Sequence, residues 1–139
     1  MRDSDRQELI RLALEAQKNA YAPYSGFWVG AAVLAESGKI YTGANVENAS
    51  YPAGMCAERN AVFHAAACGE RRILAVAIAG GPGGENGGYC PPCGICRQVM
   101  REFCDPKEMR VITAASTEDF REQTLEELLP DSFGPEYLR

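Results

Sequence analysis

The chain has 139 residues, of which 46% are apolar, and it carries 14 basic against 19 acidic residues for a net charge of −5. This length predicts one globular domain over residues 1–139, and the acidic balance disfavours nucleic acid, whose binding depends on neutralising phosphates with basic side chains. No apolar run reaches the ~20 residues that span a bilayer and the start lacks a secretory signal, so we expect a cytoplasmic protein that acts on a small molecule.

The first elements predict a helix followed by a β-hairpin. Residues 4–20 place apolar side chains among charged ones at helical spacing, and residues 3–5 offer Asp and Ser as candidate caps. After a break rich in Tyr, Pro and Gly, residues 28–34 and 40–46 are both rich in strand-forming side chains and are joined by a short turn.

The middle of the chain predicts two helices that follow extended segments. Residues 56–68 are rich in Ala and end at Gly69, which is typical of a largely buried helix with a glycine end signal. Residues 73–79 form a continuous apolar run of strand length, and the Gly-rich segment 80–88 is expected to be a loop. A second helix is predicted over residues 93–103.

The last third adds a strand over residues 109–115, a short edge strand over 120–124 and a helical turn over 125–129, before an irregular tail from Pro130. The order helix, hairpin, helix, strand, helix, strand implies a mixed sheet with helices on both faces. The two long apolar strands suit its centre.

The cysteines carry the chemical signal of this sequence. There are six of them, and in a chain without a secretion signal Cys pairs at two-residue gaps bind metal more often than they form disulfides. Cys56 opens one predicted helix, and Cys93 and Cys96 lie one turn apart at the start of the other. Thiols at a helix N-terminus have a lowered pKa, which favours the thiolate ligand. We therefore expect zinc between two helix starts at one edge of the sheet.

Three thiolate ligands leave one of the four zinc positions open, which is typical of a catalytic rather than a structural site. Glu58 lies two residues after Cys56, away from the helix face of the sulfur, so we interpret it as a proton carrier and not as a ligand. Because three thiolates leave the zinc site with a net negative charge, Arg59 and Arg97 are expected to donate to the sulfurs and offset it. A metal beside a proton-carrying carboxylate indicates hydrolysis.

Cys90 leaves two alternatives open. As a fourth ligand it would close a Cys₄ site and turn the protein into a zinc-stabilised binding module without catalysis. The spacing of Cys90 from Cys93, or of Cys93 from Cys96, also permits a redox dithiol. Against the fourth-ligand alternative, Pro91 and Pro92 keep Cys90 extended, whereas Cys93 and Cys96 can converge.

These motifs resemble the zinc-dependent cytidine deaminase family, in its short homotetrameric branch with three Cys ligands. The likeness runs through Tyr24-Ser25-Gly26-Phe27-Trp28-Val29-Gly30-Ala31-Ala32, Asn45-Val46-Glu47-Asn48-Ala49-Ser50, Cys56-Ala57-Glu58, Pro92-Cys93-Gly94-Ile95-Cys96-Arg97-Gln98 and Leu128-Leu129-Pro130. The resemblance implies a three-layer α/β/α sandwich with a mixed, mostly five-stranded sheet. It also implies hydrolytic deamination of free cytidine and 2′-deoxycytidine to uridine and 2′-deoxyuridine, with release of ammonia, in pyrimidine salvage.

The same resemblance implies a role for each matching residue. One Zn²⁺ per chain is held by the three cysteines, Cys56, Cys93 and Cys96, while Glu58 moves protons. Substrate contacts are implied for Phe27 against the pyrimidine, Asn45 and Glu47 on the ribose hydroxyls, the Ala57 backbone on the base amide edge, and Phe133 entering the site of a neighbouring subunit.

Without the resemblance, several of these residues have equally ordinary interpretations. Phe27 would be assigned to the core, and Asn45 and Glu47 would suit a solvated strand end. A deaminase for a cytosine-containing antibiotic of the blasticidin S type would share the metal chemistry, but the ribose-type pair disfavours it. Composition leaves open whether the segment 80–88 only lengthens a connection or reshapes the site near Cys93.

Overall fold

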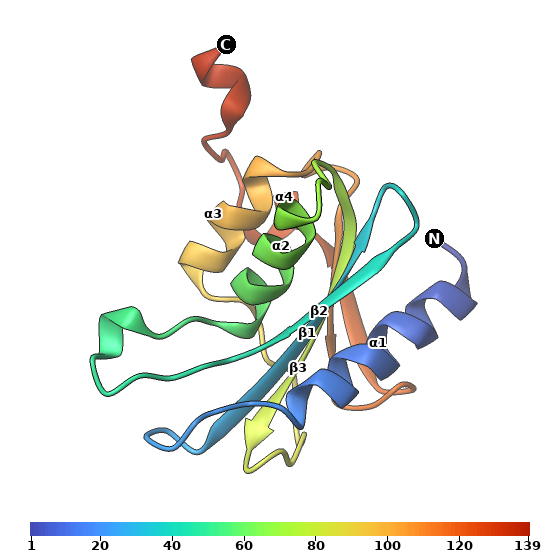
Figure 1. The fold of residues 1–139 in the computed structure, drawn as a ribbon. Coiled ribbons are helices and arrows are strands. Elements are labelled where there is room, and N and C mark those ends of the chain that lie inside the picture. The colour runs from blue at the N-terminus through green and yellow to red at the C-terminus, as the bar shows by residue number, and fades with distance from the viewer.

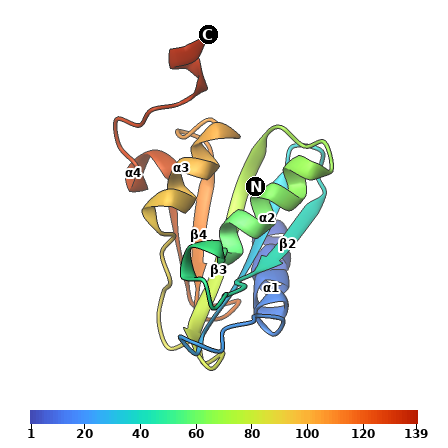
Figure 2. The same ribbon diagram turned by 60° about the vertical axis from the view of Figure 1, so that its left-hand side comes forward.

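The computed structural model describes residues 1–139 and confirms a five-stranded mixed sheet with helices on both faces (Figures 1 and 2). The elements are α1 (Asp3–Gln17), β1 (Phe27–Ala35), β2 (Ile40–Ala44), η1 (Tyr51–Ala53), α2 (Ala57–Ala67), β3 (Ile73–Pro82), α3 (Gly94–Glu102), β4 (Arg110–Ala114), β5 (Phe120–Thr124), α4 (Leu125–Leu128) and η2 (Pro135–Leu138). The strand order is β2-β1-β3-β4-β5. None of the helices is both long and apolar enough to cross a membrane.

The central strand β3 explains why its sequence is apolar throughout. It pairs antiparallel with β1 on one side and parallel with β4 on the other, while β2 and β5 form antiparallel edges. Helix α1 packs against one face of the sheet, and α2 and α3 pack against the other. Both faces of β3 are therefore covered, which removes the alternation of polar and apolar side chains.

Helix α1 lies unusually close to β1. Its buried stripe of Leu9, Ile10 and Ala13 fits the predicted helical spacing. At Gly30 of β1 an added Cβ would lie 2.1 Å from the Ala13 carbonyl oxygen, so only glycine allows this approach. The predicted cap was wrong: the N-cap is Arg2, because the Asp5 carboxylate, three residues on, accepts from the Arg2 N–H at 3.2 Å.

Helices α2 and α3 both begin where the sequence predicted, directly after a cysteine. Cys56 and Cys93 are the N-cap residues and have extended backbone conformations, with ψ of 152° and 167°. Helix α2 ends before Gly69, whose φ of +93° gives the expected glycine termination. Buried alanines on α2 let it lie against β1 and β2, so the two helix starts come together over the sheet.

The Gly-rich segment differs from the prediction because its first three residues are part of β3. Val29 of β1 pairs with Gly80 and Trp28 pairs with Gly81, so the ladder continues past the apolar run. The chain then turns sharply, and a Cβ at Gly81 would lie 1.8 Å from the Glu85 carbonyl oxygen. The glycines here serve a close backbone approach and a tight turn.

The C-terminal segment from Pro130 leaves the body of the molecule beyond α3 and ends in η2 (Figures 1 and 2). Four hydrogen bonds from two side chains of α3 hold it near its base. Gln98 donates to the Phe133 carbonyl oxygen at 2.9 Å, and the buried Arg101 donates to Ser132 and to Glu136. We refer to residues 130–139 as the C-terminal arm.

Candidate metal centre and active site

Three cysteine sulfurs meet where α2 and α3 begin. The Sγ atoms of Cys56, Cys93 and Cys96 lie within 4.8 Å of one another, and Cys93 and Cys96 are 3.4 Å apart. Sulfurs that share a tetrahedral zinc at ~2.3 Å lie roughly 3.8 Å apart. The sulfur cluster therefore fits one zinc ion.

The cluster lies between the starts of α2 and α3, on the face of the sheet that these two helices cover. The fully buried Cys96 belongs to the same core cluster as Val76 and Ile78 of the central strand β3, and the half-buried Cys56 packs against that cluster. Buried alanines on α2 allow this helix to lie close over β1 and β2. The hydrophobic core therefore covers the side of the metal centre that faces the sheet.

Cys90 stands apart from these three sulfurs. It is half-buried, and its Sγ lies against Gly80 of β3, outside the cluster that could hold a metal. Burial raises the pKa of its thiol to about 11, which favours the neutral form. The arrangement contradicts a closed Cys₄ site, and the free thiol is not paired in a disulfide.

The helix starts and a neighbouring arginine favour thiolate at this centre. A hydrogen bond from Cys96 lowers the pKa of Cys56 to about 5, and the Arg59 guanidinium adds to the decrease. The same bond to Cys56, together with burial, raises the pKa of Cys96. The helix dipoles also stabilise negative charge on these sulfurs.

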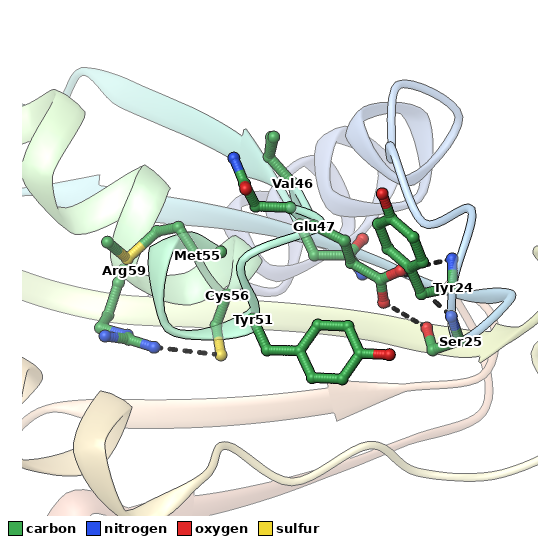
Figure 3. Close-up of a pocket in the computed structure, with 11 residues that line it drawn as sticks. Tyr24, Ser25, Val46, Glu47, Tyr51, Met55, Cys56 and Arg59 are labelled. Carbon is green, nitrogen blue, oxygen red and sulfur yellow. Dashed lines mark hydrogen bonds between the residues drawn. The ribbon is translucent and has the colours of Figure 1, made fainter.

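The two arginines expected beside the sulfurs have different partners. Arg59 Nη2 donates to Cys56 Sγ at 3.5 Å (Figure 3), and its Nε is buried without a hydrogen-bond partner. A cation beside three thiols suits a thiolate-rich metal site. Arg97 instead donates to two carbonyl oxygens, those of Pro92 at 2.8 Å and Leu128 at 2.6 Å. Its expected bond to a sulfur is absent, and it fixes the chain that precedes Cys93.

Glu58 is the only buried carboxylate of the chain, with 5% of its surface exposed. Burial raises its pKa to about 7, the negative charge of Cys56 adds to the increase, and Arg59 opposes it. Such a group is comparably stable with and without its proton near neutral pH. It has the properties of a group that takes up a proton in one step and returns it in the next.

A cavity of about 520 Å³ opens beside the sulfur of Cys56. Figure 3 shows Arg59 and Cys56 at one end and Tyr24 and Ser25 at the other, with the Tyr51 ring between them. This volume is within the range of small-molecule sites. The complete lining comprises Tyr24, Ser25, Asn45, Val46, Glu47, Asn48, Tyr51, Gly54, Met55, Cys56 and Arg59.

Asn45 lies in the cavity wall and holds the start of β1. Its Oδ1 accepts from the Val29 N–H at 2.9 Å, and its Nδ2 donates to the Phe27 carbonyl oxygen at 2.8 Å. One N–H of the amide and one lone pair of the oxygen remain for another partner. The residue therefore positions Phe27 and still has capacity to bind a hydroxyl.

Glu47 also lines the cavity while holding a neighbouring segment of backbone. Its Oε1 accepts from the N–H groups of Tyr24 and Ser25 at 2.9 and 3.1 Å, and its Oε2 accepts from the Ser25 hydroxyl (Figure 3). The bond from Ser25 lowers the pKa of this carboxyl and keeps it ionised. A carboxylate has about four lone-pair sites, so it can accept from further donors on the cavity side.

The remaining predicted substrate residues lie in three different settings. Phe27 is 38% exposed at the start of β1, Ala57 is fully buried at the first position of α2, and neither residue lines the cavity. Phe133 is 56% exposed on the C-terminal arm and does not line the cavity of its own chain.

The sequence did not assign a role to the aromatic side chains of the cavity. Tyr24 and Tyr51 meet edge to face with ring centroids 5.9 Å apart, and Tyr51 is 75% exposed. Tyr24 lies within one of the segments that carried the resemblance, which could have drawn attention to it. The role of Tyr51 in lining the cavity could not be predicted from the sequence, because it depends on where η1 lies in the fold.

Comparisons with known proteins agree with this geometry. The family described as "Cytidine and deoxycytidylate deaminase zinc-binding region" matches residues 3–114. The chain is similar to a protein named cytidine deaminase from Halalkalibacterium halodurans, with 46% identity over 132 residues, 95% of this chain and 96% of the relative.

Two solved structures are also similar to the chain. The crystal structure of cytidine deaminase from Burkholderia pseudomallei has a TM-score of 0.81 and 45% identity, covering 91% of this chain and 97% of its own. That of cytidine deaminase from Mycobacterium tuberculosis has a TM-score of 0.80 and 40% identity, covering 94% and 98%. Fold and sequence therefore lead to the same family.

Proposed function

Because this chain belongs to the family of zinc-binding cytidine and deoxycytidylate deaminases, we propose that it hydrolyses free cytidine and 2′-deoxycytidine, releasing ammonia. Zinc-dependent deamination of cytidine is its activity, and the cofactor is a single zinc per chain. The observation that carries the mechanism is the buried Glu58 next to the sulfur cluster. The finer assignments below concern the substrate, the site residues and the assembly.

We assign the zinc ligands to Cys56, Cys93 and Cys96, and zinc bound there supplies Lewis-acid activation of the attacking water. Glu58 accepts a proton from that water and delivers it to N3 of the pyrimidine. Glu58 then takes a second proton from the hydroxyl group now on C4 and passes it to the C4 amine, so that the C4 carbonyl forms as ammonia leaves. Burial suits this work, because it keeps the two protonation states of the carboxyl close in free energy near neutral pH.

The arginine beside the sulfurs has a separate task. Arg59 places a positive charge 3.5 Å from Cys56 Sγ and so offsets part of the negative charge of three thiolates. A site with less net negative charge attracts the electrons of the water more strongly. Arg59 thereby supports the reaction without touching the substrate.

The cavity favours a nucleoside over a nucleotide. Its charged lining residues are Glu47 and Arg59, and the Arg59 guanidinium already donates a hydrogen bond to Cys56. No other cation faces the cavity to bind a phosphate, and Glu47 would repel one on the 3′ side of the sugar. The spare donor and acceptor capacity of Asn45 and Glu47 suits ribose hydroxyls instead. The same pair argues against a blasticidin-S-type substrate.

The base end of the site is assigned to Phe27 and Ala57. Asn45 fixes the Phe27 carbonyl, which holds the ring at the start of β1 where it is partly exposed. Ala57 is the first residue of α2, so its backbone N–H belongs to the unpaired group at a helix start and can contact the amide edge of the base. Aromatic packing and one backbone contact would orient the ring toward Glu58.

The C-terminal arm supports an oligomeric active unit, with four copies as the proposed assembly. The arm projects from the body, and its exposed Phe133 has no cavity to fill within its own chain (Figures 1 and 2). Sedimentation of the zinc-loaded protein should give a tetramer, and Phe133→Ala should raise KM for cytidine. A fully active monomer would contradict this assignment.

We also place the protein in the cytoplasm, in pyrimidine salvage, as one domain over residues 1–139. None of the six cysteines forms a disulfide, which suits a reducing compartment.

A substrate panel tests the proposed function. Zinc-loaded protein should convert cytidine and 2′-deoxycytidine, followed by the change in ultraviolet absorbance from cytosine to uracil. The 3′- and 5′-monophosphates of cytidine should react with kcat/KM about 100-fold lower, because no cation compensates the phosphate. Turnover of neither nucleoside would overturn the function, and equal turnover of the monophosphates would overturn the substrate assignment.

A further inference from the structure

In the segment between β3 and α3, the side chain of Cys90 lies near Gly80 and near the ring of Phe27. A Cβ placed on the buried Gly80 would lie 2.8 Å from Cys90 Sγ, 3.0 Å from Cys90 Cβ and 3.2 Å from Phe27 Cε1. The three residues therefore meet at one point. Cys90 and Gly80 lie behind a ring that is 38% exposed and is our candidate contact for the pyrimidine.

The segment that leads to Cys90 is held at two residues, Asn86 and Tyr89. Gln17 of α1, only 3% exposed, forms a reciprocal amide pair with Asn86, with bonds of 2.7 and 2.8 Å. Three residues later the Tyr89 hydroxyl donates to Asp119 at 2.5 Å, and Arg121 lies over the Tyr89 ring at 5.5 Å. These contacts fix the position of the segment before Cys90 relative to α1 and to the turn before β5.

Neither the metal centre nor the acid–base chemistry uses Cys90. Its sulfur is outside the three-sulfur cluster; Cys90 packs against the core cluster, and its sulfur and the Phe27 ring both lie within 3.2 Å of the point where a Cβ on Gly80 would stand. A packed apolar contact of this kind restricts where the ring can lie, because close-packed atoms respond to a change of one methyl group.

We propose that Cys90 and Gly80 are positioning residues for Phe27, which together form a support behind its ring and thereby set the affinity for the pyrimidine. This inference rests on the proposed contact between Phe27 and the base. The support acts on binding and not on the proton transfers, which belong to Glu58 and the sulfur cluster on α2 and α3. Its disturbance should therefore appear in KM for the nucleoside and leave kcat and the zinc content nearly unchanged.

A pair of glycine variants tests the support. In Gly80→Ala the new methyl must displace Cys90 or Phe27, so KM for cytidine should rise about tenfold. Gly88→Ala is the matched control, because it makes the same change in the same segment where a Cβ meets nothing within 4 Å. Its KM should equal that of the wild type, and kcat should stay within about twofold in both variants.

Relief of the clash provides the second arm. In the double variant Gly80→Ala with Cys90→Ala the sulfur is gone, so KM should return at least halfway to the wild-type value on a logarithmic scale. If Gly80→Ala does not fold, Cys90→Leu carries the test alone, because its added bulk presses on the same ring and should raise KM with zinc retained. Equal KM values for Gly80→Ala and Gly88→Ala, or no recovery in the double variant, would overturn the inference.

A Phe27→Ala variant separates this inference from the function on which it rests. A raised KM in Phe27→Ala together with insensitivity to Gly80 and Cys90 would overturn only the support. An unchanged KM in Phe27→Ala would overturn both the support and the assigned base contact. Loss of bound zinc in Gly80→Ala would also contradict the proposal, because it would place the effect at the metal centre.

Discussion

The two segments that supply the sulfur cluster are built in different ways. The α2 segment, residues 56–59, carries a proposed ligand, the proton carrier and the balancing cation within one helical turn. The α3 segment, residues 86–97, carries two proposed ligands, but hydrogen bonds with distant parts of the chain fix its position. Chemistry is thus concentrated in the first segment, while the second depends on long-range contacts for its placement.

Removal of single thiols should give the largest effect and separates the two sulfur environments within the α3 segment. Cys96→Ser replaces a fully buried sulfur of the cluster with a poor zinc ligand, so the purified variant should contain little zinc and show almost no turnover. Cys90→Ser should keep its zinc. Elemental analysis of both variants makes the comparison, and loss of zinc from Cys90→Ser would revive the fourth-ligand alternative.

Replacing the two arginines compares the segments directly. Arg59→Gln removes the charge that contacts Cys56, so zinc affinity or activity should fall about 10- to 100-fold. Arg97→Gln loosens the Pro92 and Leu128 carbonyls without touching a sulfur, so its loss should be smaller. Zinc transfer to a coloured chelator measures both, and a larger loss in Arg97→Gln would reverse the contrast drawn between the segments.

The amide pair that ties the α3 segment to α1 should matter for stability. Gln17→Ala leaves the partner Asn86 and the Trp28 carbonyl without their buried partner, which should lower the free energy of unfolding by about 1–3 kcal/mol. The double variant Gln17→Leu with Asn86→Leu should lose less than the two single leucine variants added together. Denaturant unfolding measures the effect, and additive losses would show that the pair does not act as a unit.

A pH effect on the C-terminal arm should be the smallest. Arg101 lowers the pKa of Glu136 below its ordinary 4.5 in the folded protein. The arm is therefore held most firmly above that ordinary value, and the contact is lost as the pH falls through the lowered pKa. Hydrogen exchange of residues 130–139 should rise in acid, and less so in Glu136→Gln, where the ion pair is already absent. Equal acid dependence in both proteins would exclude this ion pair as the cause.

The α2 segment could be predicted from the sequence because its information is local. A cysteine before an alanine-rich run predicts a helix start with a thiol at its N-cap, and the structure places Cys56 and Glu58 accordingly. Arg59 reaches the sulfur one turn away, within the same helix. Sequence spacing alone therefore predicted that a thiol, a carboxylate and a cation, those of Cys56, Glu58 and Arg59, lie together at the start of α2.

The α3 segment could be predicted only in part, because its partners are distant in sequence. Arg97 binds the Leu128 carbonyl, 31 residues further on, which no local pattern announces. The extension of β3 through Gly80 depends on the pairing with Val29 of β1, and a glycine-rich composition hides it. Asn45 lines the cavity and also forms hydrogen bonds with the backbone at the start of β1. The sequence did not predict these backbone bonds, because they join residues that are distant in the chain.

The central claim is that Glu58 moves protons beside a zinc that it does not bind. The most direct measurement compares turnover and zinc content in Glu58→Gln, with Glu102→Gln on the exposed end of α3 as the control. Glu58→Gln should lose about 10²- to 10⁴-fold in kcat and keep one zinc per chain, while the control should match the wild type. Wild-type turnover, or loss of zinc in parallel with activity, would contradict the claim.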